Sequence, residues 1–402
     1  MPASTRHEAH FAALDRLLTR HEGLWRTRPF HHRALCWEAA EPDLCAALLD
    51  LDDAALERLE TDDAALARWL RPWIGDDGAD LIALARLPAL PTRPLKPPPR
   101  LDTGIPGRKW AQIQAFAAIL PGDGREVLEW CAGKGHLGRL LAAADGRRVT
   151  SLEWQPALCR AGEREAAEAK VPVRFAEADA LAPDSGRWLP AEGQAIALHA
   201  CGDLHVALMR HWVAGNCQRL TLSPCCYHLI GADHYQPLSA PATRSSLHLE
   251  KLDLQLPLRE TVTAGQAVRR KRHIERLWRL AFDEWQREIR GEDSYLPLPT
   301  FPKQLLSTTF GDFCRWAAAA KGLPVPAIVD EPRWLRRGEH RLRLTRRMEL
   351  PGQPFRRPLE LWLALDRVLF LEAHGARVRL GTFCSKPLTP RNILIDGERP
   401  VA

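Results

Sequence analysis

Between residues 126 and 222, short apolar runs alternate with amphipathic segments, and this alternation restricts the possible fold more than any other feature of the chain. The runs that we expect to form strands are 126–130, 148–152, 171–176, 195–198 and 219–222. Helices are expected between them, at 138–144, 157–169 and 204–213. Strands and helices that alternate at this spacing form a parallel sheet covered by helices on both faces. The sequence therefore predicts an α/β domain.

The C-terminus offers the helix and strand pair with which such a sheet normally ends. A helix is expected at 359–373, and strands at 376–382 and 392–396. We therefore predict a first part of the core at 105–230, a large insertion at 231–355 and the closing part at 356–402. The proline-rich segment 91–104 is predicted to be an extended linker. Before it, apolar residues recur at helical spacing, which predicts a helical N-terminal domain at 1–90.

Charge is distributed unevenly along the 402 residues. The net charge is +6, but the first 90 residues are acidic, so that the remainder carries about +12. The ten cysteines are scattered and two of them are adjacent, which argues against a disulfide framework and for reduced thiols. No apolar run is long enough to span a membrane, and no secretion signal is evident at the start, so we expect a cytoplasmic protein with no membrane partner. The sequence does not predict the oligomeric state.

The segment from Val127 to Gly138 is the strongest chemical motif. A strand leads into a turn with Gly133 and Gly135, and a helix follows at once, which allows a ligand to approach the backbone closely. No Lys-Ser/Thr pair closes the turn, so it does not have the form of a phosphate-binding loop. Glu129, at the strand end, is placed to accept hydrogen bonds from an amino-acid-like part of a cofactor.

Acidic residues also follow the next two strands. Glu153 lies about 20 residues beyond the turn, where a carboxylate can hold both hydroxyls of a ribose. Trp154 is placed to lie against an adenine, and Asp179 to accept from its amino group. An adenosyl cofactor explains this set, although such acids can also simply cap the helices that follow them.

These residues carry a resemblance to a known family. The segment EWCAGKGHLG (129–138) resembles the first motif of class I S-adenosylmethionine-dependent methyltransferases, with Cys131 at the first glycine position. ALHACGDL (197–204), SPCCYHL (223–229) and the late segments 365–367 and 390–392 resemble the eukaryotic methyltransferase-like proteins with a ribosomal RNA adenine dimethylase domain. A weaker similarity links them to tRNA 2′-O-methyltransferases of the acceptor stem.

The resemblance implies a Rossmann-like methyltransferase fold with S-adenosylmethionine as cofactor. The cofactor-binding residues that we expect on this basis are Glu129, Cys131, Ala132, Gly133, Gly135, Glu153, Trp154, Asp179, Ala180 and His199.

Methyl transfer from S-adenosylmethionine requires an acceptor held in line with the sulfonium, and a base where the acceptor carries a proton. His199 and His228 are the candidate bases because they lie at strand ends, although either can equally be a structural histidine. Cys225, in a Pro-Cys pair at a strand end, is a third catalytic candidate as a nucleophile toward a pyrimidine, or else a small buried side chain. A zinc site from Cys201, Cys225, Cys226 and His228 lacks the usual ligand spacing, so no metal site is predicted.

Two basic stretches, 269–273 and 333–357, predict RNA as the partner. The second contains nine arginines and two glutamates. Trp278 and Trp285 lie near the first stretch, and a solvated helix face with a buried tryptophan stripe would explain the same residues. We therefore expect a methyltransferase that acts on rRNA or tRNA. The alternatives are a protein methyltransferase and a non-catalytic RNA-binding protein on a methyltransferase scaffold.

Overall fold

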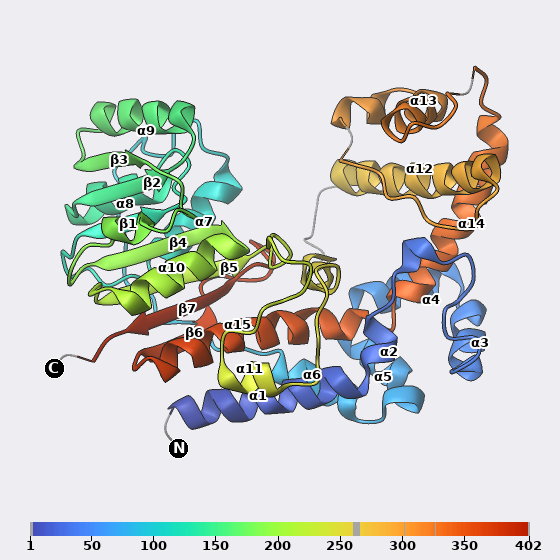
Figure 1. The fold of residues 1–402 in the computed structure, drawn as a ribbon, viewed down its shortest axis with the longest axis horizontal. Coiled ribbons are helices and arrows are strands. Elements are labelled where there is room, and N and C mark those ends of the chain that lie inside the picture. Colours follow the sequence, from blue (N-terminus) through green and yellow to red (C-terminus); the bar gives the residue numbers. More distant parts are fainter. Residues whose placement is uncertain (1–2, 260–265, 301, 326, 401–402) are drawn as a thin grey trace. The chain divides into compact units, whose positions relative to one another are not determined.

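The computed structural model describes residues 3–259, 266–300, 302–325 and 327–400, and it divides the chain into two compact units (Figure 1). The sheet unit comprises Met1–Arg20, Ala83–Val262 and Arg356–Ala402. The helical unit comprises His21–Ile82 and Thr263–Phe355. Helix α1 (Ala3–Arg20) thus belongs with the sheet, whereas the other N-terminal helices join the inserted segment. This grouping differs from the predicted ranges because the contacts that define it are distant in sequence.

A seven-stranded sheet in the order β3-β2-β1-β4-β5-β7-β6 forms the centre of the sheet unit. Its strands are β1 (Val127–Trp130), β2 (Val149–Glu153), β3 (Val173–Glu177), β4 (Gln194–Cys201), β5 (Arg219–Cys225), β6 (Arg377–Thr382) and β7 (Ile393–Glu398). Strands β1 to β5 pair with one another in parallel, while β7 is antiparallel to both β5 and β6. The predicted α/β Rossmann-like methyltransferase fold is confirmed.

Helices flank this sheet as the alternating pattern requires. The remaining helices of the unit are α7 (Gly107–Ala117), α8 (His136–Asp145), α9 (Pro156–Glu168), η2 (Ser185–Trp188), α10 (Asp203–Ala214), α11 (Ala240–Arg244), η3 (Asp253–Arg259) and α15 (Arg356–Ala373). Apolar side chains of α7, α8, β1 and β2 share one buried cluster, which includes Phe116, Leu140 and Val127. Because β1 lies in the middle of the sheet, this cluster fixes the strand that leads into the glycine-containing turn.

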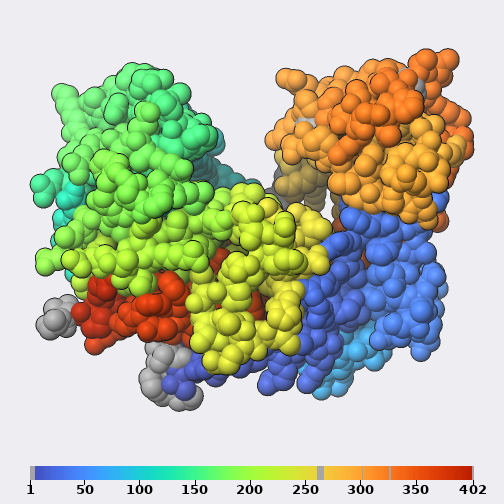
Figure 2. Space-filling model, in the orientation of Figure 1, coloured from blue at the N-terminus to red at the C-terminus, as the bar shows by residue number. Residues whose placement is uncertain are grey.

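Helix α15 is buried along most of its length and packs against β6, β7 and α1. The rings of Phe11 and Trp362 lie 5.0 Å apart, and the Trp362 indole donates to Asp15 of α1 at 2.8 Å. The segment that follows β5, with α11 and η3, also packs on α15, and Figure 2 shows this yellow segment against the red C-terminal one. The last helix therefore anchors the chain that leaves the fifth strand.

In the predicted linker 91–104, residues 91–98 form neither helix nor strand and residues 99–104 form turns, and the residues just before the linker pair with the sheet edge. Leu90 N–H donates to the carbonyl of Thr382 at 3.0 Å, and Thr382 N–H donates to the carbonyl of Pro88 at 2.9 Å. Gly381 allows this approach, because a Cβ there would lie 2.6 Å from the side chain of Leu90. Proline suits such a position, where only some N–H groups are needed for pairing.

The helical unit consists of two stretches of chain. Its elements are α2 (Glu22–Trp25), η1 (Pro29–His31), α3 (Pro42–Asp50), α4 (Asp53–Thr61), α5 (Asp63–Ile74), α6 (Asp77–Leu84, ending at the boundary), α12 (Gln266–Arg290), η4 (Lys303–Ser307), α13 (Phe310–Ala320), α14 (Glu331–Glu349) and η5 (Gln353–Phe355). Trp278 and Trp285 are buried in an apolar cluster between α12, α13 and α14. Their burial favours the buried-stripe interpretation of these tryptophans. No helix in the described part of the chain is long and apolar enough to cross a membrane.

Candidate active site

The carboxyl ends of β1 to β5 meet at one edge of the sheet, and the strand order reverses between β1 and β4. Such a reversal opens a crevice outside the strand ends, where α/β proteins of this type bind ligands. The residues predicted for the cofactor and for catalysis lie in the last residues of these strands or shortly after them. The candidate site is therefore at the topological switch point.

The turn after β1 has the open backbone that a ligand needs. Gly133 and Gly135 have φ values of 60° and 64°, which only glycine adopts without strain. A Cβ on Gly135 would lie 2.6 Å from Phe175, whereas nothing lies within 4 Å of the corresponding position on Gly133. Gly135 is thus required by packing, and Gly133 leaves free space beside the turn.

Cys131 stands where the family motif has a glycine, and it adopts the same left-handed conformation with φ of 56°. Burial, followed by the charges of Glu153 and neighbouring groups, raises the pKa of this thiol to about 12. The side chain is therefore a neutral thiol. The substitution keeps the backbone form of the turn and adds a small side chain to it.

Glu129 is buried and faces the beginning of α8. Its Oε2 accepts hydrogen bonds from Gly138 N–H at 2.9 Å and from the Ser151 hydroxyl at 3.0 Å. Burial raises the pKa of Glu129 to about 7. The carboxyl group thus joins α8 to β2, and its predicted contact with the cofactor stays a prediction.

Glu153 and Trp154 form a second part of the crevice at the end of β2. Glu153 is buried, and its two oxygens accept from Gly133 N–H at 2.9 Å and from Gln155 N–H at 3.0 Å. The indole of Trp154 is 67% exposed. A buried carboxylate beside an exposed aromatic face fits a ribose and an adenine, so these residues suit the predicted cofactor.

Asp179 follows β3 and is exposed, and its Oδ1 accepts from Leu181 N–H at 2.9 Å. Ala180 beside it is buried. This hydrogen bond agrees with the interpretation of Asp179 as a capping residue. The second carboxylate oxygen is available to accept a hydrogen bond from a ligand. Contact of Asp179 and Ala180 with the adenine stays a prediction.

His199 lies near the end of β4 with φ of 68°, and its Nε2 is 3.0 Å from Oε1 of Gln112. If Nε2 donates in this bond, Nδ1 is the free acceptor. Desolvation by the surrounding protein, with the positive charges of Lys109 and Arg391, lowers the pKa of His199. The imidazole is therefore neutral at pH 7 and able to accept a proton.

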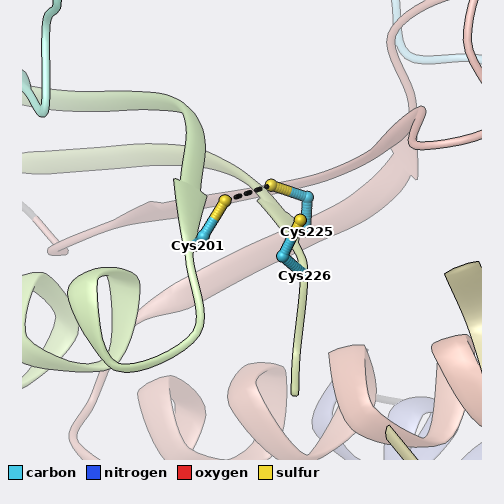
Figure 3. A group of neighbouring side chains, drawn as sticks. All are labelled: Cys201, Cys225 and Cys226. Atoms are coloured by element: carbon cyan, nitrogen blue, oxygen red, sulfur yellow. Dashed lines mark hydrogen bonds between the residues drawn. The ribbon is translucent and has the colours of Figure 1, made fainter. Parts of the chain in front are cut away.

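Three thiols gather between the ends of β4 and β5 (Figure 3). The sulfur atoms of Cys201 and Cys225 are 3.2 Å apart, and Cys226 lies with them. Hydrogen bonds with the other two thiols raise the pKa of Cys225 and lower that of Cys226. Cys226, which was not among the predicted catalytic residues, is thus the most acidic of the three thiols, and Cys225 stays protonated.

His228 follows this thiol cluster. Burial lowers the pKa of His228, and its Nδ1 is buried with no hydrogen-bond partner in the described part of the chain. The structure thus places both predicted bases, His199 and His228, near the thiol cluster, since the charge of Cys226 acts on each of them.

Some residues at these strand ends have strained backbone conformations. Three non-glycine residues at this edge have positive φ: Cys131, His199 and Cys226, with values of 56°, 68° and 43°. Such conformations cost of order 1–3 kcal/mol each and gather at functional sites. Of the six non-glycine residues with positive φ in the described part of the chain, three thus gather at this edge.

A buried network from α15 supports the site, and sequence reasoning did not assign it. Arg367 donates to His205 Nε2 at 2.7 Å and to the Tyr235 hydroxyl at 2.9 Å. Nδ1 of His205 lies 3.0 Å from the carbonyl of Ala200, within the segment that carries His199 and Cys201. Residues 365–367, which carried part of the family resemblance, were the signal that could have led to this network.

The basic stretches of the helical unit differ in their pairing. Residues 269–273 are exposed, and no ion pair to them is found among the described residues. In the second stretch, Arg337 and Arg341 pair with Glu284, and Arg346 pairs with Glu60. Much of the 333–357 stretch is thus neutralised within the unit.

Comparison with known proteins gives one family match. Residues 108–233 match a family described as a methyltransferase domain. No curated protein matches the chain.

Several solved structures are similar to parts of the chain at low identity. Magnesium protoporphyrin IX methyltransferase from Synechocystis PCC 6803, with bound SAH, is 17% identical over 40% of this chain and 71% of its own, with a TM-score of 0.25. An rRNA methylase from Streptococcus thermophilus is 13% identical over 29% of this chain and 70% of its own, with a TM-score of 0.23. A possible exported protein from Bordetella parapertussis is 13% identical over 99% of this chain and 97% of its own, with a TM-score of 0.30. Likenesses at this level do not indicate a substrate.

The sheet order and the family match together assign a class I methyltransferase domain to this chain. The chain is a methyltransferase, and S-adenosylmethionine is its cofactor.

Proposed function

We propose that this enzyme transfers the methyl group of S-adenosylmethionine to RNA, with rRNA or tRNA as the substrate class. The observation that supports RNA is the run Arg269-Arg270-Lys271-Arg272-His273 at the start of α12, exposed along its whole length. Unpaired cations in a row suit a phosphate backbone, which they bind by releasing its counterions. The resemblance to proteins with a ribosomal RNA adenine dimethylase domain belongs to this proposal.

In this proposal the cofactor lies along the crevice at the ends of β1 to β3. The turn at Gly133 and Gly135 lets its amino-acid part approach the backbone, Glu153 holds the ribose and Trp154 covers the adenine. The cofactor supplies an activated methyl group on its sulfonium. The protein therefore has mainly to exclude water and to hold the acceptor in line with that methyl.

His199 is the proposed base. Its depressed pKa keeps the imidazole neutral, so that Nδ1 can take the proton that the acceptor loses. The protonated Cys225 is not a ready nucleophile, which disfavours attack on a pyrimidine ring by that residue. His228 is the second candidate for the base.

Incubation with methyl-labelled S-adenosylmethionine and an extract from cells that lack the gene tests the proposal. Label is expected in the RNA fraction. Label only in protein would overturn RNA in favour of a protein acceptor, and cofactor binding without label in either fraction would favour a non-catalytic scaffold or a small-molecule acceptor.

Binding of unmodified RNA tests the basic run separately. Replacement of Arg269, Arg270 and Arg272 by glutamine is expected to weaken binding and to reduce the slope of log K against log salt by roughly 2. The matched control replaces Arg148, Arg160 and Arg164, three exposed arginines of the sheet unit, so that the net charge falls equally. Equal losses in both variants would mean that total charge, and not this run, attracts the RNA.

A further inference from the structure

The thiol cluster has a geometry that methyl transfer does not require. Cys201 ends β4, Cys225 ends β5 and Cys226 follows directly, so the ends of two adjacent strands bring the three sulfur atoms together (Figure 3). All three sulfur atoms lie within 4.8 Å of one another. A cysteine that serves only as a small apolar side chain does not need other thiols beside it. Cys217 and Cys314 are examples, since each is buried away from the cluster.

We propose that Cys201, Cys225 and Cys226 bind one zinc ion through their three sulfur atoms, with a fourth position open to water or to an incoming ligand. Zinc prefers thiolate sulfur and tetrahedral geometry, and its Zn–S bonds of about 2.3 Å place sulfur atoms roughly 3.8 Å apart. The observed spacing, with one pair at 3.2 Å and all within 4.8 Å, brackets this value. Small side-chain rotations are enough to form the site.

Burial and charge around the cluster suit a metal ion that enters from solvent. Cys225 is 3% exposed, whereas Cys201 and Cys226 are partly exposed. Each thiol that still carries a proton releases it to solvent as its S–Zn bond forms. Three thiolates and Zn²⁺ leave one net negative charge, which the cation Arg391 near Cys226 stabilises.

The backbone supports the same assignment. Cys226 has φ of 43°, a conformation that costs a non-glycine residue about 1–2 kcal/mol. The peptide turn at this residue brings two adjacent side chains into one cluster, where an extended strand would send them to opposite faces. A bond from Cys226 to a metal ion would offset the cost of this strained turn.

The ligand spacing explains why the sequence predicted no metal. Adjacent cysteines rarely ligate one ion in regular loops, and the third ligand is 24 residues earlier in the chain. The site depends on the pairing of β4 with β5 and not on a local motif.

Metal content of the full-length protein tests the proposal without reference to activity. Protein purified with a phosphine reductant and without chelator is expected to retain about one zinc per chain in elemental analysis. Cys201→Ser and Cys226→Ser are expected to lose it, while Cys36→Ser, which removes an exposed thiol outside the cluster, keeps it. Cobalt substitution should give thiolate-to-metal charge-transfer absorption and the visible bands of a tetrahedral site in the wild type only.

A measurement on the wild-type protein tests the zinc site even if the serine variants do not fold. Titration with an organomercurial should release the zinc as the cluster thiols react, detected by a metallochromic dye. Wild-type protein without zinc, or zinc that is retained in both serine variants, would overturn the proposal. A Cys201–Cys225 disulfide found by mass spectrometry in metal-free protein would instead identify the cluster as a redox pair.

Discussion

Glu153 ends β2 with each carboxylate oxygen already accepting a backbone N–H, from Gly133 and from Gln155. These bonds orient the side chain before any cofactor arrives, which reduces the entropic cost of binding. Each oxygen has a second lone pair for a ribose hydroxyl. The residue therefore combines support of the turn with recognition of the cofactor.

We predict that Glu153→Ala weakens binding of S-adenosylhomocysteine by on the order of 2–3 kcal/mol, because two hydrogen bonds to a charged group are lost. Titration calorimetry measures the effect. Glu177→Ala is the matched control, since Glu177 ends the neighbouring strand β3 with an exposed side chain. Unchanged affinity in Glu153→Ala would refute the ribose assignment.

Glu129 leads to a pH-dependent prediction. Its pKa of about 7 in the fold is above the value of about 4.3 in an unfolded chain, so folding favours the protonated form. The stability that this group contributes is complete below about pH 4 and is lost as the pH rises through about 7. Glu129→Gln cannot ionise, so its stability relative to the wild type should rise by about 3 kcal/mol from pH 4.5 to pH 8.

Urea unfolding of both proteins across this pH range, without cofactor, checks the expectation. All other titrating groups are common to the two proteins and cancel in the difference. Parallel stability curves would show that Glu129 is already ionised at low pH in the folded protein.

At the scale of elements, the predicted strands agree closely with the observed ones, because the sequence of a buried parallel strand is a short continuous apolar run. The predicted strand at 148–152 is β2 at Val149–Glu153, and the predicted helix at 359–373 is α15 at Arg356–Ala373. The thiol cluster was beyond prediction for a physical reason. The register of β4 against β5 pairs Leu198 with Ser223, then shifts by one residue so that Cys201 lies opposite Cys225. A bulge of this kind leaves no trace in hydrophobic periodicity.

Helix α15 gives a prediction at the same scale. Fully buried Asp366 accepts hydrogen bonds from the Tyr235 hydroxyl at 2.5 Å, Leu238 N–H at 2.9 Å and Ser239 N–H at 2.7 Å. Asp366→Ala removes the carboxylate that accepts all three hydrogen bonds and leaves the donors unpaired, at an expected cost on the order of 3–5 kcal/mol. Tyr235→Phe removes one donor to Asp366 and one acceptor for Arg367, leaves both backbone hydrogen bonds in place, and should cost about 1.5–3 kcal/mol.

Denaturant unfolding of the two variants measures this difference. A larger loss in Asp366→Ala would show that the carboxylate holds the backbone after β5 and not only the tyrosine. Equal losses would mean that the two backbone hydrogen bonds contribute nothing to the stability of the fold.

At the scale of the whole molecule, the helical unit is assembled from two segments, His21–Ile82 and Thr263–Phe355, and arginine side chains connect them. Arg341 is 2% exposed and bonds to Asp283, Glu284 and the carbonyl of Phe30. Arg287 likewise donates to the carbonyl of His31. From sequence alone the arginines of 333–357, Arg341 among them, predicted an RNA-binding surface, because their acidic partners lie on other elements and far along the chain. Their pairing is a property of the folded unit.

Arg341 and Arg343 lie on the same helix, α14. Substitution of each in turn distinguishes the contribution of positive charge to stability from its contribution to RNA binding. Arg341→Met leaves two buried carboxylates without this cation, so we expect a loss on the order of 3–5 kcal/mol in the free energy of unfolding. Arg343 is exposed, so Arg343→Met should change stability by no more than about 0.5 kcal/mol. RNA affinity should respond in the opposite manner, with a salt-dependent loss in Arg343→Met and none in folded Arg341→Met. If Arg341→Met proved stable and impaired in RNA binding, the buried arginines would be part of the RNA surface after all, and the helical unit would have to open to bind.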